Sequence, residues 1–530
     1  MLVVAALLGA LGVAAAPINQ ANFTYVHVPG TVPLNGLEPL QQRLSYVNST
    51  AMFVSWNTYA SLNSSEATVV YGTDPFNLKH TAHAESLTYN TSRTWNHHAL
   101  LTELKPKTDY WYRVAYTNCY ACTNIPTYKF TTARAPGDES PYSVAVVIDL
   151  GTMGADGLSD HYGPYITGGH HIPWKKDESN TIQSMIQNLD TYDAVLHPGD
   201  IAYSDYFIKQ SVQGYFGTSN ASVIVNKTAV AEGYERLFRA SIASLIIRAQ
   251  ILLEEFYDQM QSITAVKPYM VTAGNHEANC DNGGTSDSRN NITYGLDIYM
   301  PGQYNFTGFI NHWRMPGNPT EANRNFWYSY DDGMVHVVFF DTETDLGGNF
   351  TGPDEPGGFY GEDSGPFGTY KNEQIDWLKK DLAAVDRKKT PWVIAMGHRP
   401  WYVSGTNVSS TVCLECQQAF EPIFVEYGVD LIMQGHVHAY QRNKPMANYY
   451  VDPNGLNNPS SPLSILNGAG GHYDGLDTLL NATSWSAYQN DQLYGWSRLT
   501  FHNRTHMTHQ FIASGNSTVI DEVTLYKEHK

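Results

Sequence analysis

The sequence predicts an all-β domain followed by an α/β domain. Between about residues 33 and 135, short runs alternate apolar and polar residues, the two-residue period of strands, and turn residues separate them. Residues 133–141 form a polar linker rich in Pro and Gly. Beyond it, apolar strand-length runs alternate with segments of helical periodicity, which is typical of α/β folds. We expect the domains to span residues 17–136 and 140–530.

The chain begins with a candidate export signal. Residues 2–16 are apolar and end in small side chains just before Pro17, so we place a secretory signal peptide at residues 1–16. This run is too short to span a bilayer, and no later stretch of the sequence is long and apolar enough to do so. We therefore expect a secreted, extracellular protein with no membrane span, and leave attachment to a cell wall open.

Thirteen Asn-x-Ser/Thr sequons agree with export, because such asparagines are glycosylation acceptors in secreted proteins. The expected glycosylation sites are Asn22, Asn48, Asn63, Asn90, Asn220, Asn226, Asn291, Asn305, Asn349, Asn407, Asn481, Asn503 and Asn516.

Four of the five cysteines form two Cys-x-x-Cys pairs, Cys119/Cys122 and Cys413/Cys416. Such pairs can bind zinc in a reducing compartment, whereas disulfides are expected in an exported protein. We expect one disulfide within each pair, although spacing alone does not fix the connectivity.

The formal net charge of −19 argues against nucleic acid or an anionic membrane as the main partner. A small phosphate ligand would be repelled as well, unless bound metal ions dominate the field at its site.

In the first domain, residues 51–56 and 67–71 alternate as strands do, residues 104–114 are a turn leading into a strand, and residues 128–132 are a last strand. Short strands at this spacing predict a β-sandwich. The segment Leu104-x-Pro-x-Thr-x-Tyr110 resembles the corner of a fibronectin type III domain, with Trp56 as its core tryptophan. No catalytic pattern lies here, so we interpret this domain as a scaffold or interface module.

In the second domain, the residues that follow each apolar run are informative. Five runs end in Asp149-Leu-Gly, Gly-Asp200-x-x-Tyr203, Gly-Asn275-His276-Glu277, Gly-His398-Arg399-Pro and Gly-His436-Val-His438, and a sixth ends at Asp341-Thr-Glu343. Strand ends of this kind line the ligand site of open α/β sheets. We therefore expect these polar residues to gather at one edge.

Seven of these side chains suit metal ions: Asp149, Asp200, Tyr203, Asn275, His398, His436 and His438. The set is too large for one ion and suits two ions that share a carboxylate. A tyrosine becomes a good ligand for a strongly Lewis-acidic ion such as Fe³⁺. In an extended chain, His436 and His438 point to the same side.

These motifs, in this order after a fibronectin-like domain, resemble the purple acid phosphatases, a branch of the metallophosphoesterases. The tyrosine of Gly-Asp200-x-x-Tyr203 separates this branch from the others, and Asn503-Arg-Thr-His506 also looks like the family. The resemblance covers the chain from about residue 33 to the end. It implies that the second domain is a metallophosphoesterase α/β sandwich of two mixed sheets flanked by helices.

The resemblance also implies a ligand assignment. Fe³⁺ would be held by Asp149, Asp200, Tyr203 and His438, and a divalent ion (Zn²⁺, Mn²⁺ or Fe²⁺) by Asp200, Asn275, His398 and His436. Asp200 would bridge the two ions. The implied activity is that of a secreted acid phosphatase, which hydrolyses small-molecule phosphate monoesters by metal-hydroxide attack.

Two alternatives stay open. The first is phosphodiesterase or phytase activity at the same site. The second is a glycoprotein whose β domain binds a partner while the metal site is vestigial, and the complete set of seven ligands argues against it.

His276 adjoins a proposed ligand, and we expect it to contact phosphate or to protonate the leaving oxygen. Many plant members of the family carry a histidine pair about ten residues after Gly-His, whereas residues 402–410 contain no histidine. Arg399 either binds phosphate or holds its loop through a carboxylate, and we favour the loop role slightly.

Two long segments, residues 204–266 and 281–325, are either lids over the strand ends or decoration. The first contains an expected helix at residues 229–260, and a second helix is expected at residues 372–385.

Overall fold

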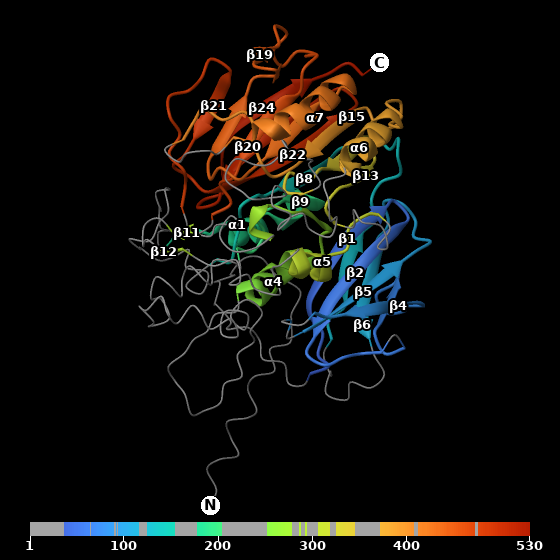
Figure 1. Cartoon of the computed structure of the whole chain (residues 1–530). Coiled ribbons are helices and arrows are strands. Elements are labelled where there is room, and N and C mark those ends of the chain that lie inside the picture. Colours follow the sequence, from blue (N-terminus) through green and yellow to red (C-terminus); the bar gives the residue numbers. More distant parts are fainter. Residues whose placement is uncertain are drawn as a thin grey trace, which may run out of the picture.

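In the computed structural model, two parts of the chain lie side by side (Figure 1). The structure describes residues 36–63, 65–89, 92, 94–115, 125–153, 177–203, 252–277, 286–287, 292–293, 306–317, 325–344, 372–406, 412–471 and 475–529.

The first part is a seven-stranded antiparallel sheet in the order β1-β2-β5-β4-β3-β6-β7. Its strands are β1 (Leu40–Asn48), β2 (Ala51–Thr58), β3 (Thr68–Gly72), β4 (His80–Leu87), β5 (Trp95–Leu101), β6 (Asp109–Ala115) and β7 (Tyr128–Thr131). The first half of β4 pairs with β3 and its second half with β5, so β4 belongs to both halves of the sheet. Trp56 is fully buried in the core. The predicted all-β domain is confirmed.

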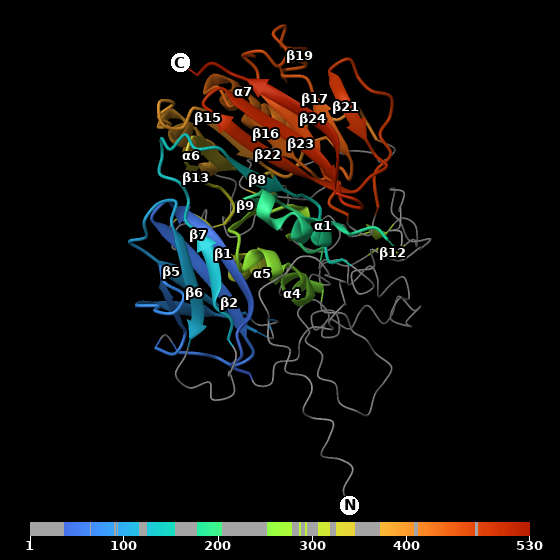
Figure 2. The same cartoon turned by 180° about the vertical axis from the view of Figure 1, so that it is seen from behind.

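The second part contains two mixed sheets, as predicted. The first sheet has the order β10-β9-β8-β22-β23-β24, in which β8, β9 and β10 are parallel and the rest antiparallel. Its strands are β8 (Tyr142–Val146), β9 (Ala194–Pro198), β10 (Tyr269–Thr272), β22 (Gly495–Asn503), β23 (His506–Ala513) and β24 (Thr518–Tyr526). The last three are best seen from behind (Figure 2).

The second sheet has the order β13-β14-β15-β16-β20-β17-β21, with β14, β15, β16 and β20 parallel. Its strands are β13 (Tyr328–Asp332), β14 (Val335–Phe339), β15 (Trp392–Met396), β16 (Leu431–Gln434), β17 (Tyr440–Asn443), β20 (Leu463–Asn467) and β21 (Ser486–Asn490).

Side chains on the central strands of this sheet alternate between two cores. In β15, Ile394 and Met396 join the large core that also contains the first sheet, whereas Val393 and Ala395 join a separate core with helices α6 (Glu373–Ala383) and α7 (Leu414–Glu426). Successive side chains of a strand point to opposite faces, so a strand that is covered on both faces is apolar throughout. The continuous apolar runs in the sequence follow from this burial.

Three helices lie near the first sheet: α1 (Thr181–Gln187), α4 (Leu252–Thr264) and α5 (Thr307–His312). A capping box of Asn180 and Gln183 starts α1. Short elements complete the described chain: η2 (Leu189–Thr191), η4 (Asn275–Glu277), β11 (Ser286–Asp287), β12 (Ile292–Thr293), β18 (Met446–Ala447) and β19 (Tyr450–Val451). None of the helices within the described ranges is long and apolar enough to cross a membrane.

The predicted helices agree in part with the structure. Helix α6 lies within residues 372–385. Helix α4 begins inside the range 229–260 and runs four residues beyond it, to Thr264, while residues 229–251 lie outside the described chain. The end of α4 packs on β1, where the Thr264 hydroxyl donates to the Gln42 carbonyl at 2.8 Å. This contact lies at the four residues by which α4 runs past the predicted end.

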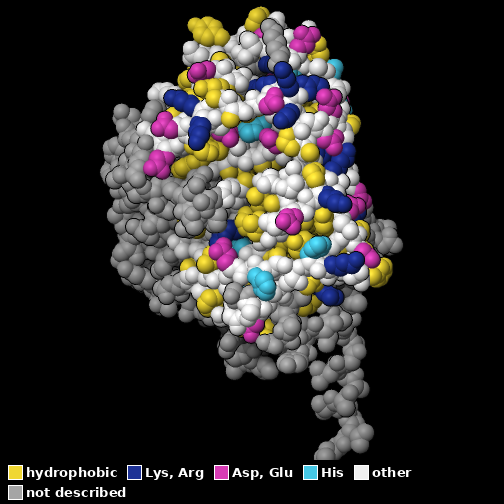
Figure 3. Space-filling view, turned by 90° about the vertical axis from the view of Figure 1, so that its right-hand side faces the viewer, with side chains coloured by type: hydrophobic (Ala, Val, Ile, Leu, Met, Phe, Trp, Pro, Cys, Tyr) yellow, Lys and Arg dark blue, Asp and Glu magenta, His cyan; other side chains and the backbone are white. Residues whose placement is uncertain are grey.

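The surface shown in Figure 3 mixes charges of both signs. Lys and Arg side chains are interspersed with Asp and Glu, so positive charge is not concentrated on this face.

Candidate metal centre

The ends of five parallel strands, from both sheets, converge on one point. In the first sheet, Asp149 follows β8, Asp200 and Tyr203 follow β9, and Asn275 follows β10; in the second, His398 follows β15, and His436 and His438 follow β16. The structure brings all seven predicted side chains together there.

Three of these side chains form what we call the tyrosine group: Asp149, Tyr203 and His438. The Tyr203 hydroxyl oxygen lies 2.9 Å from Asp149 Oδ1 and 2.7 Å from His438 Nε2. It also lies 3.1 Å from Asp200 Oδ2.

Three others form the asparagine group: Asn275, His398 and His436. Asn275 Oδ1 lies 3.0 Å from His398 Nε2 and 2.9 Å from His436 Nδ1. His398 Nε2 also lies 3.1 Å from Asp200 Oδ2. The same carboxylate oxygen of Asp200 therefore contacts both groups. Potential ligand atoms of Asp200, His398 and His436 all lie within 4.8 Å of one another.

The backbone is unusual at four of these residues. The φ angles are +57° at Asp149, +53° at Asp200, +52° at Tyr203 and +68° at His436. Residues other than glycine rarely adopt this left-handed conformation, which costs about 1–3 kcal/mol at each position and clusters at functional sites. The surrounding packing must hold these turns in place.

Two glycines leave room for the carboxylates. A Cβ atom at Gly274 would lie 2.3 Å from Asp200 Oδ1, and one at Gly435 would lie 2.3 Å from Asp149 Oδ2. Since both distances are far below van der Waals contact, any larger residue would displace a carboxylate. The glycines in Gly-Asn-His-Glu and Gly-His-x-His are therefore required by close packing.

Backbone amides hold one oxygen of each carboxylate. Asp200 Oδ1 accepts from the amide of His276 at 3.0 Å, and Asp149 Oδ2 accepts from the amide of His436 at 2.8 Å. The other oxygens, Asp200 Oδ2 and Asp149 Oδ1, face the clustered side chains.

Two histidines are oriented by carbonyl groups. His398 Nδ1 lies 3.3 Å from the Pro198 carbonyl oxygen, and His438 Nδ1 lies 3.1 Å from that of Gly475. A carbonyl only accepts, so each Nδ1 carries hydrogen and each neutral ring turns the lone pair of Nε2 toward carboxylate oxygens. Lone pairs that face one another need a cation between them, and metal-binding histidines are commonly held in this way. The donor set thus fits metal ions.

The pKa shifts point the same way. Burial lowers the pKa of His398, but the Asp200 carboxylate outweighs burial and raises it to about 9. Burial raises the pKa of Asp200, but His398 and His276 outweigh it and lower the pKa well below its usual value. This position favours positive charge next to an ionised carboxylate.

Glu277 belongs to the centre, although its position in the sequence predicted no role for it. Its buried carboxylate accepts from the backbone amides of Asp200 at 2.9 Å, Ile201 at 2.8 Å and Gly274 at 2.8 Å. Burial and the nearby Asp200 raise the pKa of Glu277 to about 8. Glu277 therefore ties the end of β9 to the end of β10, and the only signal for it was its place in Gly-Asn-His-Glu.

His276 lies beside the centre. Its ring centroid is 4.2 Å from that of Tyr203, and its Nε2 is 3.8 Å from Asp200 Oδ2. The His276 side chain is buried.

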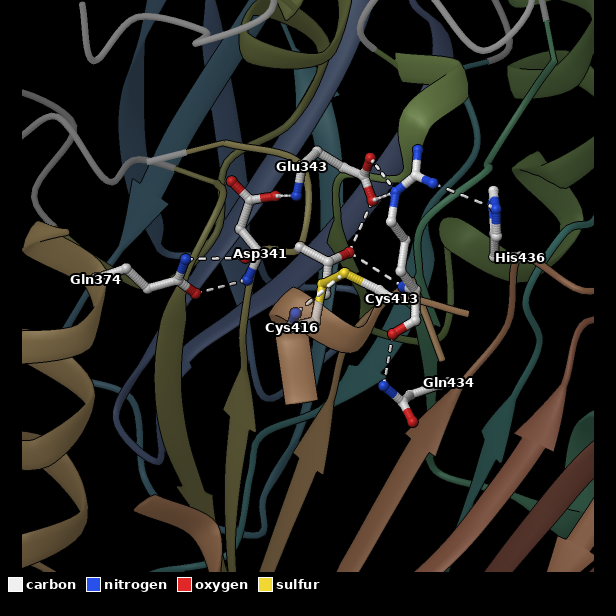
Figure 4. Close-up of a disulfide and its surroundings, with 9 residues drawn as sticks. Asp341, Glu343, Gln374, Cys413, Cys416, Gln434 and His436 are labelled. Atoms are coloured by element: carbon white, nitrogen blue, oxygen red, sulfur yellow. Dashed lines mark hydrogen bonds and ion pairs between the residues drawn. A yellow bond between two sulfur atoms is a disulfide. The ribbon is translucent and has the colours of Figure 1, made fainter. Parts of the chain in front are cut away.

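The Arg399 side chain is paired with the buried carboxylate of Glu343, at 2.9 Å and 3.1 Å from Nε (Figure 4). This is the kind of contact expected for a loop-holding role. In the histidine-free stretch 402–410, Tyr402 is buried and its hydroxyl contacts Glu421, while residues 407–410 lie outside the described chain.

Cys413 and Cys416 form a disulfide at the start of α7. Cys119 and Cys122 lie outside the described residues. Five predicted glycosylation sites are described, and all are exposed: Asn48, Asn63, Asn481, Asn503 and Asn516. The other eight lie outside the described residues: Asn22, Asn90, Asn220, Asn226, Asn291, Asn305, Asn349 and Asn407.

Carboxylate, phenol, amide and imidazole groups thus lie at the facing strand ends of two mixed sheets. This arrangement is typical of a metal-dependent hydrolase of the phosphoesterase class. Comparison with known protein families supports this class in three segments of the chain. Residues 39–132 match the purple acid phosphatase N-terminal domain, residues 158–440 the calcineurin-like phosphoesterases, and residues 461–522 the iron/zinc purple acid phosphatase-like protein C. The chain belongs to the purple acid phosphatase family and is a hydrolase of that family.

Individual relatives support the assignment. Acid phosphatase A of Cryphonectria parasitica is 37% identical over 516 residues, covering 94% of each chain. An acid phosphatase of Aspergillus ficuum is 31% identical, covering 91% of this chain and 86% of its own. Among solved structures, purple acid phosphatase PPD1 from yellow lupin seeds has a TM-score of 0.66 at 22% identity, covering 93% of this chain and 75% of its own, which shows a shared fold.

Proposed function

We propose that this protein is a secreted acid phosphatase that hydrolyses phosphate monoesters at a centre of two metal ions. One observation carries the proposal: a single carboxylate oxygen, Asp200 Oδ2, lies 3.1 Å from Tyr203 of the tyrosine group and 3.1 Å from His398 of the asparagine group. Two donor sets joined by one carboxylate suit a two-ion site. The similarity to acid phosphatases from two fungi supports this activity.

The tyrosine group with Asp200 would hold Fe³⁺, since its phenol and carboxylates are hard oxygen donors. The asparagine group with Asp200 would hold a divalent ion, Zn²⁺, Mn²⁺ or Fe²⁺. When bound, such ions act as Lewis acids, which activate water and neutralise charge on a phosphate ester. Two carboxylates and one phenolate would leave the pair of ions positive, so the site would attract phosphate despite the acidic protein.

The protein side chains would perform the remaining tasks. His276 would hold a proton at Nε2 for the leaving oxygen, because it lies beside the centre and Asp200 is close enough to stabilise its protonated form. Glu277 would keep the Asp200 turn in its left-handed conformation through three backbone amides. Arg399 would hold its loop through Glu343.

Secretion and glycosylation belong to the same proposal. It is supported by the apolar residues 2–16, by five exposed sequons among the described residues and by the disulfide at α7. We also propose residues 17–136 and 140–530 as the domains, since β7 ends at Thr131 and β8 begins at Tyr142.

A substrate panel at acid pH tests the proposal: p-nitrophenyl phosphate, bis(p-nitrophenyl) phosphate and phytate, together with metal analysis of the purified protein. We expect the monoester to have the highest kcat/KM and each chain to carry two ions. A higher kcat/KM for the diester or for phytate would favour the alternative activities. A protein with fewer than two ions and no hydrolysis would instead support a vestigial site.

A further inference from the structure

Helix α4 contacts both parts of the chain through two glutamines that are two residues apart. Gln261 Oε1 accepts from the Gln41 amide of the β domain at 2.6 Å, and Gln261 Nε2 donates to the Tyr128 hydroxyl at 3.2 Å. Two positions along an α-helix correspond to a rotation of about 200°. Gln259 therefore points away from these partners, toward the second part of the chain.

Gln259 pairs with the backbone of Met153. Its Oε1 accepts from the Met153 amide at 2.9 Å, and its Nε2 donates to the Met153 carbonyl at 2.8 Å. Met153 is fully buried, and Gln259 is buried as well. Because buried backbone N–H and C=O groups require hydrogen-bond partners, this one side chain satisfies both groups of Met153.

Met153 lies four residues beyond Asp149, whose left-handed φ of +57° persists only where the surrounding structure holds it. Before the turn, β8 is paired with β9 and β22. After the turn, the amides of Leu150 and Gly151 donate to the carbonyls of residues 200 and 201, at 3.2 Å and 3.0 Å. The pairing with Gln259 adds a further fixed point at Met153.

The helix that carries Gln259 is itself firmly placed. Phe256 and Met260 are buried in the large core, and the Thr264 hydroxyl donates to the β domain at the Gln42 carbonyl. Just after the helix, the Ala265 carbonyl accepts from a tyrosine hydroxyl of β6 at 2.8 Å. Several independent contacts thus hold α4, so it can serve as a rigid support for the turn.

We propose that Gln259 is a positioning residue for the metal centre: by fixing Met153, it holds the turn that presents Asp149 to the iron. This inference rests on the proposed function, in which Asp149 is a ligand of Fe³⁺ and not of the divalent ion. Loss of the pairing would weaken iron binding at the tyrosine group. It would also change the environment of the Tyr203 phenolate on the iron.

The test uses Gln259→Met, which has a similar length and no hydrogen-bonding amide. Iron should bind about 10- to 100-fold more weakly in competition with a chelator, the usual effect of changing a group that orients a ligand. The divalent ion should be retained. At equal iron occupancy, the visible band of the Tyr203 phenolate should shift, and amide hydrogen exchange of residues 150–153 should be about tenfold faster.

A matched control is Gln261→Met, which removes the bonds to Gln41 and Tyr128 from the same helix. Since the contacts of Thr264 and of the core remain, α4 should keep its place. This variant should lower the free energy of unfolding but leave iron affinity and the visible band unchanged. If Gln259→Met does not fold, Gln259→Asn carries the same prediction, because its amide is one methylene too short to make both bonds.

Unchanged hydrogen exchange at residues 150–153 would show that Gln259 does not hold the turn. Faster exchange with unchanged iron affinity and an unchanged band would overturn the positioning role, while the proposed function stands. Equal loss of iron from the Gln261 variant would assign the effect to the whole helix and would also overturn the role of Gln259. A wild-type protein that binds no iron would overturn both this role and the proposed Fe³⁺ site.

Discussion

The metal centre and the contact between the β domain and helices α4 and α5 are two of the regions in which polar side chains are buried. At that contact, the Arg43 guanidinium donates to the carbonyls of Gln41 at 2.7 Å and His312 at 2.9 Å and to Asn57 Oδ1 at 2.9 Å. It also lies over the ring of Tyr257. Each of these three hydrogen bonds ends on an acceptor of the protein itself.

The pKa values of histidines in the two regions are shifted in opposite directions. Burial, with Arg314 and Arg43 adding to it, holds the pKa of His98 well below its usual value, and burial and Arg43 do the same to His312. His398 is buried as deeply, yet Asp200 raises its pKa to about 9.

Burial of polar groups therefore does not identify a functional site. The metal centre differs in two physical respects. One carboxylate oxygen, Asp200 Oδ2, contacts both Tyr203 and His398, and the backbone is held in left-handed turns at four of the contributing residues. The contact at Arg43 stabilises the fold, whereas the donor set of the centre suits metal ions.

The largest effect should come from Asp200→Asn. Because Asp200 Oδ2 contacts both groups, this variant should lose both ions and essentially all phosphatase activity. His436→Ala removes a side chain of the asparagine group and should mainly lose the divalent ion. Metal analysis of both purified variants measures this. Equal loss of both ions from both variants would refute the shared-ligand assignment.

The next effect should come from His276→Ala, which removes the proposed acid without removing a ligand. Both ions should remain, and turnover should fall about 10²–10⁴-fold, the usual contribution of a general acid. The loss should be larger for an alkyl phosphate than for p-nitrophenyl phosphate, because p-nitrophenolate needs less protonation. An equal loss on both substrates would indicate phosphate binding, and loss of metal would make His276 a ligand or its support.

At the other region, Arg43→Met should act on stability alone. It leaves two buried carbonyls and an amide oxygen without their donor, so the free energy of unfolding should fall by about 3 kcal/mol. Denaturant unfolding measures the loss. The activity per folded molecule should stay at the wild-type value, and a large drop in kcat would show that the two regions are coupled.

The smallest effect concerns acid pH. Burial, with a contribution from Arg43, lowers the pKa of His97 to about 3. The unfolded chain binds this proton near pH 6.5, so between about pH 6.5 and 3 stability falls as the pH falls. Proton binding to His97 in the unfolded chain therefore lowers the free energy of unfolding at pH 5 by about 2 kcal/mol relative to pH 7.

His97→Gln keeps a polar partner for Thr58 and Ser86, which contact the ring at 2.7 Å and 2.8 Å, but cannot bind the proton. The difference in unfolding free energy between pH 7 and pH 5 should therefore shrink by about 2 kcal/mol in this variant. An unchanged difference would contradict the assigned pKa of His97.

The sequence was sufficient to predict the two-part architecture and the convergence of seven side chains. Each of these side chains follows a buried apolar strand, and parallel pairing brings the strand ends of each sheet to one edge, while the packing of the two sheets places the two edges together. The supporting carboxylates are different. Glu277 and Glu343 act on Asp200 and Arg399, which are 77 and 56 residues away in the sequence, and these contacts depend on how the strand ends are positioned in space.

Some strands of the β domain were also not predicted from the sequence. Strand β4 contains His, Thr, Ala, Glu and Ser, and no valine or isoleucine. Its strand conformation depends on pairing with β3 along one half and β5 along the other, which local propensity does not encode.

We propose that Asp200 joins two ions, one of them Fe³⁺ bound by Tyr203. Metal analysis combined with a visible absorption spectrum tests it most directly, since a phenolate on Fe³⁺ gives a charge-transfer band. We predict two ions per chain, at least one of them iron, and a visible band that Tyr203→Phe abolishes while the fold is retained. A colourless wild-type protein with full iron occupancy, or a band that survives Tyr203→Phe, would contradict the account.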